Sequence, residues 1–286
     1  MIETSFSGYS GGQFLLFYVL LFAASAGASI FITIRVRPDG RTSTTHDAAE
    51  LAYLAGGERR LTEATLASLI AADAVKVTAD RKLWSVQAGA GETAPEKAVS
   101  RITGDFGLKA AHKAIIPHAR KINADLVRKG LLMDDSERFR LRMMAAIPFL
   151  LILAVGMWRL LGGVLQGAPV GFLVALMVVT VVVMIVRVAR MSPLTVAGEN
   201  LLDQRYEEQS RLRAAPRGSE MGMGVALFGT AILVGTPFSE LHAMKAAAGA
   251  NGVGGYAGDG GDSGDGGGSD GGGSGCGGGG CGGCGG

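Results

Sequence analysis

Cysteine is almost missing from this sequence. Of 286 residues only three are cysteines, and they lie near the C-terminal end at Cys276, Cys281 and Cys284. The first 275 residues therefore cannot form a disulfide that would stabilise a small fold. Three catalytic or phosphate-binding patterns are absent as well: G-x-x-x-x-G-K-S/T, G-x-S-x-G and H-E-x-x-H. With no catalytic constellation to name, we expect a protein that is not an enzyme and that carries no cofactor.

A strong charge bias is also lacking. The formal net charge is +2, and residues 35–142 hold 19 basic and 14 acidic side chains. This mild excess, without a basic block, does not favour nucleic acid as a partner, and we expect none. The four histidines have no metal-ligand spacing, which predicts solvent-facing or hydrogen-bonded imidazoles; they are His46, His112, His118 and His242.

What the sequence does have is long apolar runs. Residues 14–34 form 21 positions without a charge, enough for a helix to cross a hydrocarbon core of about 30 Å. A cleaved signal peptide is the alternative, but signal peptides begin with basic residues, and residues 1–13 carry only Glu3 as a charge. Small residues at a spacing of four predict a packing face on this span, made of Ala24, Ser25, Ala28 and Ser29.

Two further apolar runs, residues 145–164 and 170–188, are joined by the turn "LQGAP". They predict a membrane hairpin, so the chain has three transmembrane helices. Arg159 is the one charge inside the first of these two runs, residues 145–164. Because it lies near a helix end beside Trp158, we interpret the two as an interfacial pair with a snorkelling arginine.

Arginines cluster at one end of each predicted span. By the positive-inside rule, residues 1–13 lie outside, and residues 35–142, residues 191–250 and the tail lie in the cytoplasm. The clusters are Arg35, Arg37 and Arg41; Arg138, Arg140 and Arg142; and Arg187 and Arg190. As membrane-interface anchors we take Arg35, Arg37, Arg142, Trp158, Arg159, Arg187 and Arg190.

Residues 35–142 predict a small α+β module. Asp47 is a plausible N-cap for a helix that two glycines end, and Thr62 is a plausible cap for a second helix that reaches Asp73. "AVKVTADRKLWSV" then alternates like two strands around a turn. Helix, helix and hairpin are typical of a winged-helix unit. The second helix, which would read DNA, has no basic residue, so we expect a protein-interaction or structural module.

A duplicated module is an open alternative. "INADLVRKGLLM" mirrors "LASLIAADAVKV", with Leu126 on Leu69 and Leu132 on Val75. The match covers few residues, so a single and a duplicated module both stay possible.

Residues 191–250 predict a helical segment. "GENLLDQRYEEQSRLR" indicates a polar helix, in which Glu207 and Arg211 have a favourable i,i+4 spacing. "GVALFGTAILVG", residues 224–235, is apolar all round but too short to span a membrane. It indicates either a helix buried against the module or a shallow membrane insertion.

Glycine dominates residues 251–286, which have no hydrophobic periodicity and are predicted to be disordered. Cys281 and Cys284 form a "CGGC" pair, with Cys276 five residues earlier. Three thiolates with no histidine nearby fall short of a strong zinc site. Modification of the tail by a separate enzyme and weak capture of a soft metal, Zn²⁺ or Cu(I), are the two uses these thiols suggest.

The order of these parts resembles an uncharacterised family of bacterial membrane proteins. The resemblance is carried by the N-terminal span, "AAELAYLAGGERR", "LVRKGLL", the membrane hairpin, "VALFG" and the Gly/Cys-rich tail. It implies a bacterial inner-membrane location, and it brings no established activity and no catalytic residue. A tail with three cysteines is sparse for that family.

The sequence thus predicts an α-helical membrane protein with three transmembrane helices, a winged-helix-like cytoplasmic module and a disordered Gly-rich tail. We expect it to be a membrane-anchored interaction or scaffold protein. Its expected partners are the lipid bilayer and either another protein or further copies of itself.

Overall fold

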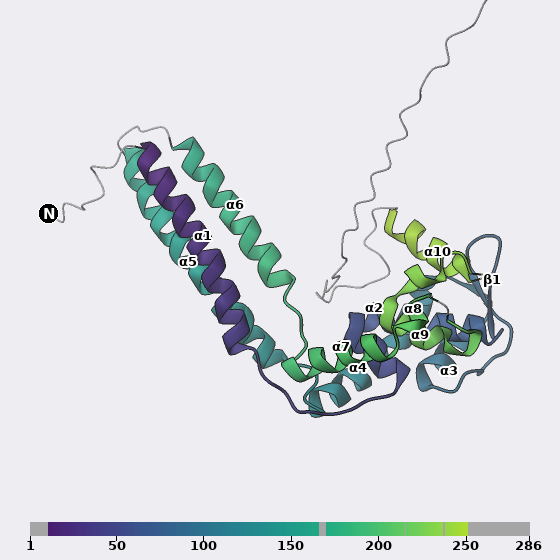
Figure 1. Cartoon of the computed structure of the whole chain (residues 1–286). Helices are drawn as coiled ribbons and strands as arrows, with labels where there is room; N and C mark the ends of the chain where they lie inside the picture. The colour runs from purple at the N-terminus through teal and green to yellow at the C-terminus, as the bar shows by residue number, and fades with distance from the viewer. Residues whose placement is uncertain (1–10, 166–169, 215, 237, 251–286) are drawn as a thin grey trace, which may run out of the picture.

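The chain folds into a bundle of three long helices and a compact module beside one end of it (Figure 1). The computed structural model describes residues 11–165, 170–214, 216–236 and 238–250. The bundle consists of α1 (Gly11–Val36), α5 (Asp135–Leu165) and α6 (Gly171–Ala189). The module is built from the segments on either side of α5 and α6, so the chain enters it twice.

The three bundle helices are long and apolar enough to cross a membrane, which confirms the three long apolar helices expected. The described parts have 24, 31 and 19 residues, and an 18-residue stretch within each has a mean hydropathy of 2.3, 2.0 and 2.8, respectively. Their outward faces are apolar as well; Phe172 on α6, for example, is 78% exposed. Large exposed apolar faces of this kind suit a lipid surrounding better than water.

The packing face of α1 differs in part from the predicted one. Ser25 and Ser29 are buried as expected, whereas Ala24 and Ala28 are exposed. The reason is that Tyr18, which is fully buried, lies 7 and 11 residues before the two serines and therefore on the same helical face. That face packs against α5 and α6.

Gly156 lets α5 pack closely against this tyrosine, because a glycine has no side chain to occupy the space of the ring. A Cβ atom added at Gly156 would lie 2.9 Å from the Tyr18 ring. The Tyr18 hydroxyl lies 3.5 Å from the Thr180 hydroxyl of α6, so one buried side chain touches both other helices.

In the module, α2 (Ala48–Ala71) begins where the sequence predicts. The Asp47 carboxylate caps it by accepting a hydrogen bond from Ala49 N at 3.0 Å. Gly56 and Gly57 leave helical geometry, so α2 consists of two helical stretches that meet at a kink; the glycines end the first stretch as predicted, and the second stretch begins directly after Gly57. Thr62 is therefore not a cap, which corrects the prediction: it lies inside α2, where its hydroxyl donates to the Glu58 carbonyl at 2.8 Å.

The predicted hairpin is present as β1 (Val75–Val77) and β2 (Leu83–Ser85), paired antiparallel. A third strand, β3 (Asp105–Phe106), adds to β2 and gives the sheet order β1-β2-β3. Two helices complete this half of the module, α3 (Ala94–Ser100) and α4 (Leu108–Arg128).

The proposed second copy of the unit does not continue into a hairpin. After α4, Leu132 makes an isolated bridge with Leu194, 62 positions later, and α5 begins at Asp135. The segment that would correspond to β1 therefore connects the part of the module that precedes α5 with the part that follows α6.

The second pass supplies α7 (Val196–Glu208), α8 (Arg211–Ala214), η1 (Gly218–Glu220), α9 (Met221–Phe228), η2 (Thr230–Leu233) and α10 (Ser239–Ala250). The predicted polar helix breaks at residues 209–210. Arg211 pairs with Glu220 at 2.5 Å rather than with Glu207, which corrects that expectation.

The apolar segment 224–235 belongs to the core of the module, as the first of its two alternatives predicted. Leu66, Val75, Ile115 and Val225 come from α2, β1, α4 and α9, and all four are fully buried in one cluster. Residues 35–142 and 191–250, expected as separate segments, therefore build one core.

Candidate functional site

The bundle joins the module through three chain segments that lie against one another. They follow α1, precede α5 and follow α6, and we call them together the collar: residues 37–41, 130–133 and 193–197. Backbone hydrogen bonds connect all three: Arg41 N to Gly130 O at 3.3 Å, Met133 N to Pro193 O at 2.9 Å, Thr195 N to Leu131 O at 3.1 Å, Val196 N to Pro38 O at 3.1 Å and Ala197 N to Asp39 O at 2.9 Å.

Two glycines allow this close approach. Gly40 and Gly130 have φ angles of +76° and +74°, which side-chain-bearing residues rarely adopt. A Cβ atom at Gly40 would lie 2.4 Å from the Gly130 carbonyl oxygen and 2.5 Å from the Thr195 hydroxyl. No larger residue fits there without moving the backbone.

Thr195 connects two of the segments through its side chain. Its hydroxyl oxygen accepts a hydrogen bond from Gly198 N at 3.1 Å and so caps α7. The same hydroxyl lies 2.8 Å from Gly130 O and 3.1 Å from Leu131 O, to which it can donate. It is buried, so water does not compete for these bonds.

Arg37, predicted as an interface anchor, ties the end of α1 to α7. Its Nε donates to the Leu194 carbonyl at 2.9 Å, and its Nη1 pairs with Glu199 at 2.5 Å. A displacement of α1 would therefore also move the start of α7.

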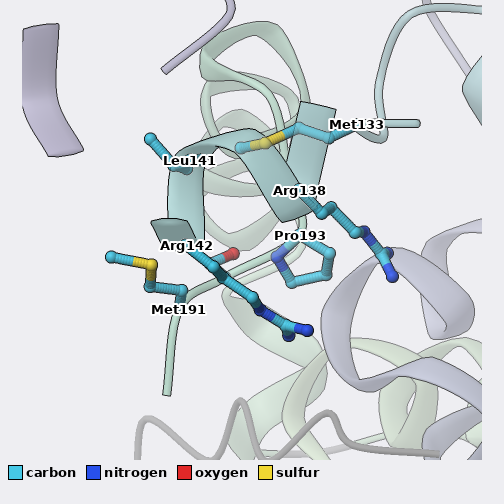
Figure 2. A pocket seen from close by; sticks show the side chains of 7 residues that line it. Met133, Arg138, Leu141, Arg142, Met191 and Pro193 are labelled. Atoms are coloured by element: carbon cyan, nitrogen blue, oxygen red, sulfur yellow. The ribbon is translucent and has the colours of Figure 1, made fainter. Parts of the chain in front are cut away.

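A small hollow lies beside the collar, where α5 enters the bundle and α6 leaves it (Figure 2). It offers about 10 Å³, room for roughly one water molecule. Its lining combines two arginines with apolar side chains: Met133, Arg138, Leu141, Arg142, Met191, Ser192 and Pro193.

The other predicted anchors lie where the sequence places them on the helices. Arg35 is in the last turn of α1, and its guanidinium lies 5.1 Å from the Phe31 ring centre. Arg187 is in the last turn of α6, and Arg190 caps that helix. At the opposite end, Trp158 is exposed and Arg159 stacks over Phe14 of α1 at 5.4 Å, so the two side chains of the predicted pair take separate positions.

The candidate cysteines of the tail, Cys276, Cys281 and Cys284, lie outside the described residues. Within residues 11–165, 170–214, 216–236 and 238–250, no group of three or more His, Cys, Asp or Glu side chains is placed to hold a metal. The soft-metal hypothesis therefore concerns the tail alone.

A threonine, a histidine and a glutamate come together inside the module. His112 Nδ1 lies 3.0 Å from the Thr62 hydroxyl, and its Nε2 lies 3.7 Å from Glu58. Burial lowers the pKa of His112 below its usual 6.5; Glu58 opposes this shift and Arg59 adds to it. Thr62 is fully buried, so no substrate reaches its hydroxyl, and the group serves to join α2 to α4.

Glu63, one of the buried charged residues of the module, contacts its last helix. The Glu63 side chain, 3% exposed, pairs with Lys245 of α10 at 2.9 Å. Leu241 and Met244 of α10 are buried beside it. The helix that precedes the tail is thus tied to α2 by this ion pair, and its two buried apolar side chains belong to the same core cluster.

The outer face of the hairpin carries two large apolar side chains that are exposed. Trp84 on β2 is 47% exposed and Val86, just beyond the strand, is 52% exposed. Lys76 and Asp105 flank Trp84 on the neighbouring strands.

Neither the collar nor the buried contacts of His112 and Glu63 could be predicted from the sequence. Local signals were present, since "RPDGR" is typical of a turn and "TVAG" of a helix start. Neither pattern says that residues 40, 130 and 195 meet. The helix that begins near Thr62, which would read DNA in a DNA-binding winged helix, is largely buried in the centre of the module.

Comparison of the chain with protein-family models, curated proteins and solved structures gives no match. The family resemblance seen in the sequence therefore stays an expectation.

Proposed function

We propose that this protein is a membrane-anchored, non-enzymatic interaction protein of the bacterial inner membrane. The bundle spans the bilayer, the N-terminus lies outside, and the module with the tail lies in the cytoplasm. The arginine-bearing ends of α1, α5 and α6 all lie at the module end of the bundle, which agrees with the positive-inside rule.

The observation that carries the proposal is the collar. Five backbone hydrogen bonds and the Thr195 side chain join the three segments of the collar. A module held in this way keeps one orientation to the membrane, whereas a flexible tether would let it swing. A fixed orientation is useful to a protein that presents one surface to a partner.

The hairpin is the surface we propose for contact, and the module then works as a winged-helix-like unit with β1–β2 as its wing. Exposed tryptophan is the side chain most enriched where protein interfaces gain their binding energy. Because much of α2 is buried, a partner would not reach it, and we assign the contact to the exposed hairpin around Trp84.

Site-specific photo-cross-linking tests the proposal. A benzophenone amino acid replaces Trp84 in the full chain in its host membrane, and the same probe replaces Ala124, which is exposed on α4, as the control. We expect a discrete cross-linked product from position 84, either with a second protein or with a second copy, and a much weaker one from position 124. Monomer alone at both positions would count against the proposal.

A further inference from the structure

Three residues stand in one row across the outer face of the sheet. Lys76 of β1 is the direct partner of Trp84 on β2, and Trp84 is the direct partner of Asp105 on β3. Residues directly opposite each other in an antiparallel sheet point to the same side. Because Trp84 is exposed, the lysine and the aspartate are exposed on the same face. This face thus carries a cation, an indole and an anion in line.

The two charges of this row are unpaired in the part of the chain that the structure describes. Neither Lys76 nor Asp105 takes part there in an ion pair or a side-chain hydrogen bond. They lie two strands apart, about 10 Å from each other, and Trp84 stands between them. Elsewhere the module pairs its cations, as Lys129 does with Glu50. The row therefore offers both charges and the indole to a partner.

The order of the row fits a second copy of the same face. When a two-fold axis runs along β2 between two such faces, the β1 side of one copy lies over the β3 side of the other. Lys76 of each copy then meets Asp105 of the other, and the two Trp84 rings stack beside the axis. A two-fold axis across the strands would instead bring like charges together. The charges therefore select one arrangement of the two copies.

The dimensions of the face suit this arrangement. Sheets that pack face to face lie about 10 Å apart, a gap that an extended lysine and an aspartate side chain fill together. Val86 continues the ladder two residues after Trp84 and is exposed on the same side, so it adds apolar surface near the axis. Lys82, two residues before Trp84, would approach its own copy. It lies at the end of the strand, where the angle of about 30° between packed sheets carries the two lysines apart.

We propose that the outer face of the sheet is a self-association surface, on which a second copy of the chain docks with Lys76 on Asp105 and Trp84 on Trp84. The inference rests on the hairpin contact proposed above and names its partner. β1 lies at the edge of the module farthest from the bundle, where a second copy can approach (Figure 1).

The contact is small, since stable soluble dimers bury roughly 800 Å² per partner and one short sheet offers only a few side chains. Two chains anchored in the same membrane meet at a raised effective concentration, which favours pairing through a small contact. The dimer is therefore expected in the membrane and is best measured there.

Disulfide trapping in isolated host membranes tests the pairing. The full chain, with its three native cysteines replaced by serine, carries Val86→Cys near the axis and should form a disulfide-linked dimer on oxidation; Ala124→Cys on α4 is the control and should form little. In the Val86→Cys chain, Lys76→Asp or Asp105→Lys alone sets like charges against each other and should lower the dimer fraction about 5-fold or more. Both changes together restore opposite charges, so the fraction should return to within about 2-fold of the original.

Expressing the two single variants together gives a readout that a folding defect cannot imitate. One chain then has two acids in the row and the other has two lysines, so chains with tags of different size should form hetero-dimers and few homodimers. Equal dimer fractions in all variants, or hetero-dimers no more abundant than homodimers, would overturn the inference. Cross-linking of position 84 to a different protein, without a disulfide dimer, would overturn it as well but leave the proposed function intact. Monomer in both experiments would contradict both proposals.

Discussion

The hydroxyl of Thr195 lies 2.8 Å from the carbonyl oxygen of Gly130, although 64 residues and two bundle helices separate them in the chain. One short contact thus connects the segment that precedes α5 with the segment that follows α6. Gly40, from the segment after α1, fits against both. This three-way contact is what gives the module a defined position.

Gly40→Ala should loosen the collar. The new Cβ meets Gly130 O and the Thr195 hydroxyl, and the positive φ adds strain, so we expect a loss of about 3 kcal/mol and a melting temperature lower by several degrees. Gly104→Ala is the control, since Gly104 has a φ of +77° but nothing within 4 Å of its added Cβ, and it should cost about 1 kcal/mol. Equal melting temperatures for the two variants would show that the close approach is not a constraint.

Thr195→Ala removes the cap of α7 and the contact to Gly130. We expect a loss of about 1–2 kcal/mol. Thr195→Ser keeps the hydroxyl and should stay within about 0.5 kcal/mol of the wild type. Hydrogen exchange at Gly198 N reports the cap directly, and its protection should fall only in the alanine variant. Similar protection in both variants would mean that the hydroxyl contributes little.

Lys245→Met should release α10. The change leaves the buried Glu63 carboxylate without this cation, and because Lys245 is itself partly exposed we expect a modest loss of about 1–2 kcal/mol. Limited proteolysis should then cut residues 239–250 faster than in the wild type. The control is Lys97→Met on α3, an exposed lysine that should leave the cleavage rate unchanged. Unchanged cleavage in Lys245→Met would show that the other contacts of α10, its buried Leu241 and Met244 and the His242–Thr230 hydrogen bond, hold the helix without this ion pair.

Acid should weaken the module through His112. Its pKa in the folded protein is below 6.5, so the unfolded chain binds the proton more readily, and stability falls as the pH drops from about 6.5 toward the lower folded value. His112→Gln, which can still meet the Thr62 hydroxyl, should lose this part of the pH dependence. The measurement is the melting temperature from pH 7.5 to 5. Parallel curves for the two proteins would rule His112 out as the cause.

Much of the fold was predictable where a pattern is local. The three long apolar helices, the Asp47 cap and the hairpin each depend on a single stretch of sequence. The helices extend beyond the predicted spans because hydropathy marks only the apolar part. The charged start of α5, from Asp135, is helical but not apolar.

What the sequence could not show is which segments meet. The apolar residues 224–235 suited a protein core and a membrane surface equally well, and only contact with α2 decides between them. Thr62 looks like a cap because threonine is a common capping residue, yet it is fully buried inside α2 and contacts His112 of α4. The collar depends on three turns far apart in the chain, and no single turn contains that information.

The orientation of the chain is the central claim, and thiol labelling in intact spheroplasts tests it most directly. A maleimide that cannot cross membranes should leave Cys276, Cys281 and Cys284 unlabelled until the cells are permeabilised. Ser7→Cys, in a chain whose three native cysteines are replaced by serine, should react in intact spheroplasts. Labelling of the tail cysteines in intact spheroplasts, with Ser7→Cys protected, would contradict the account.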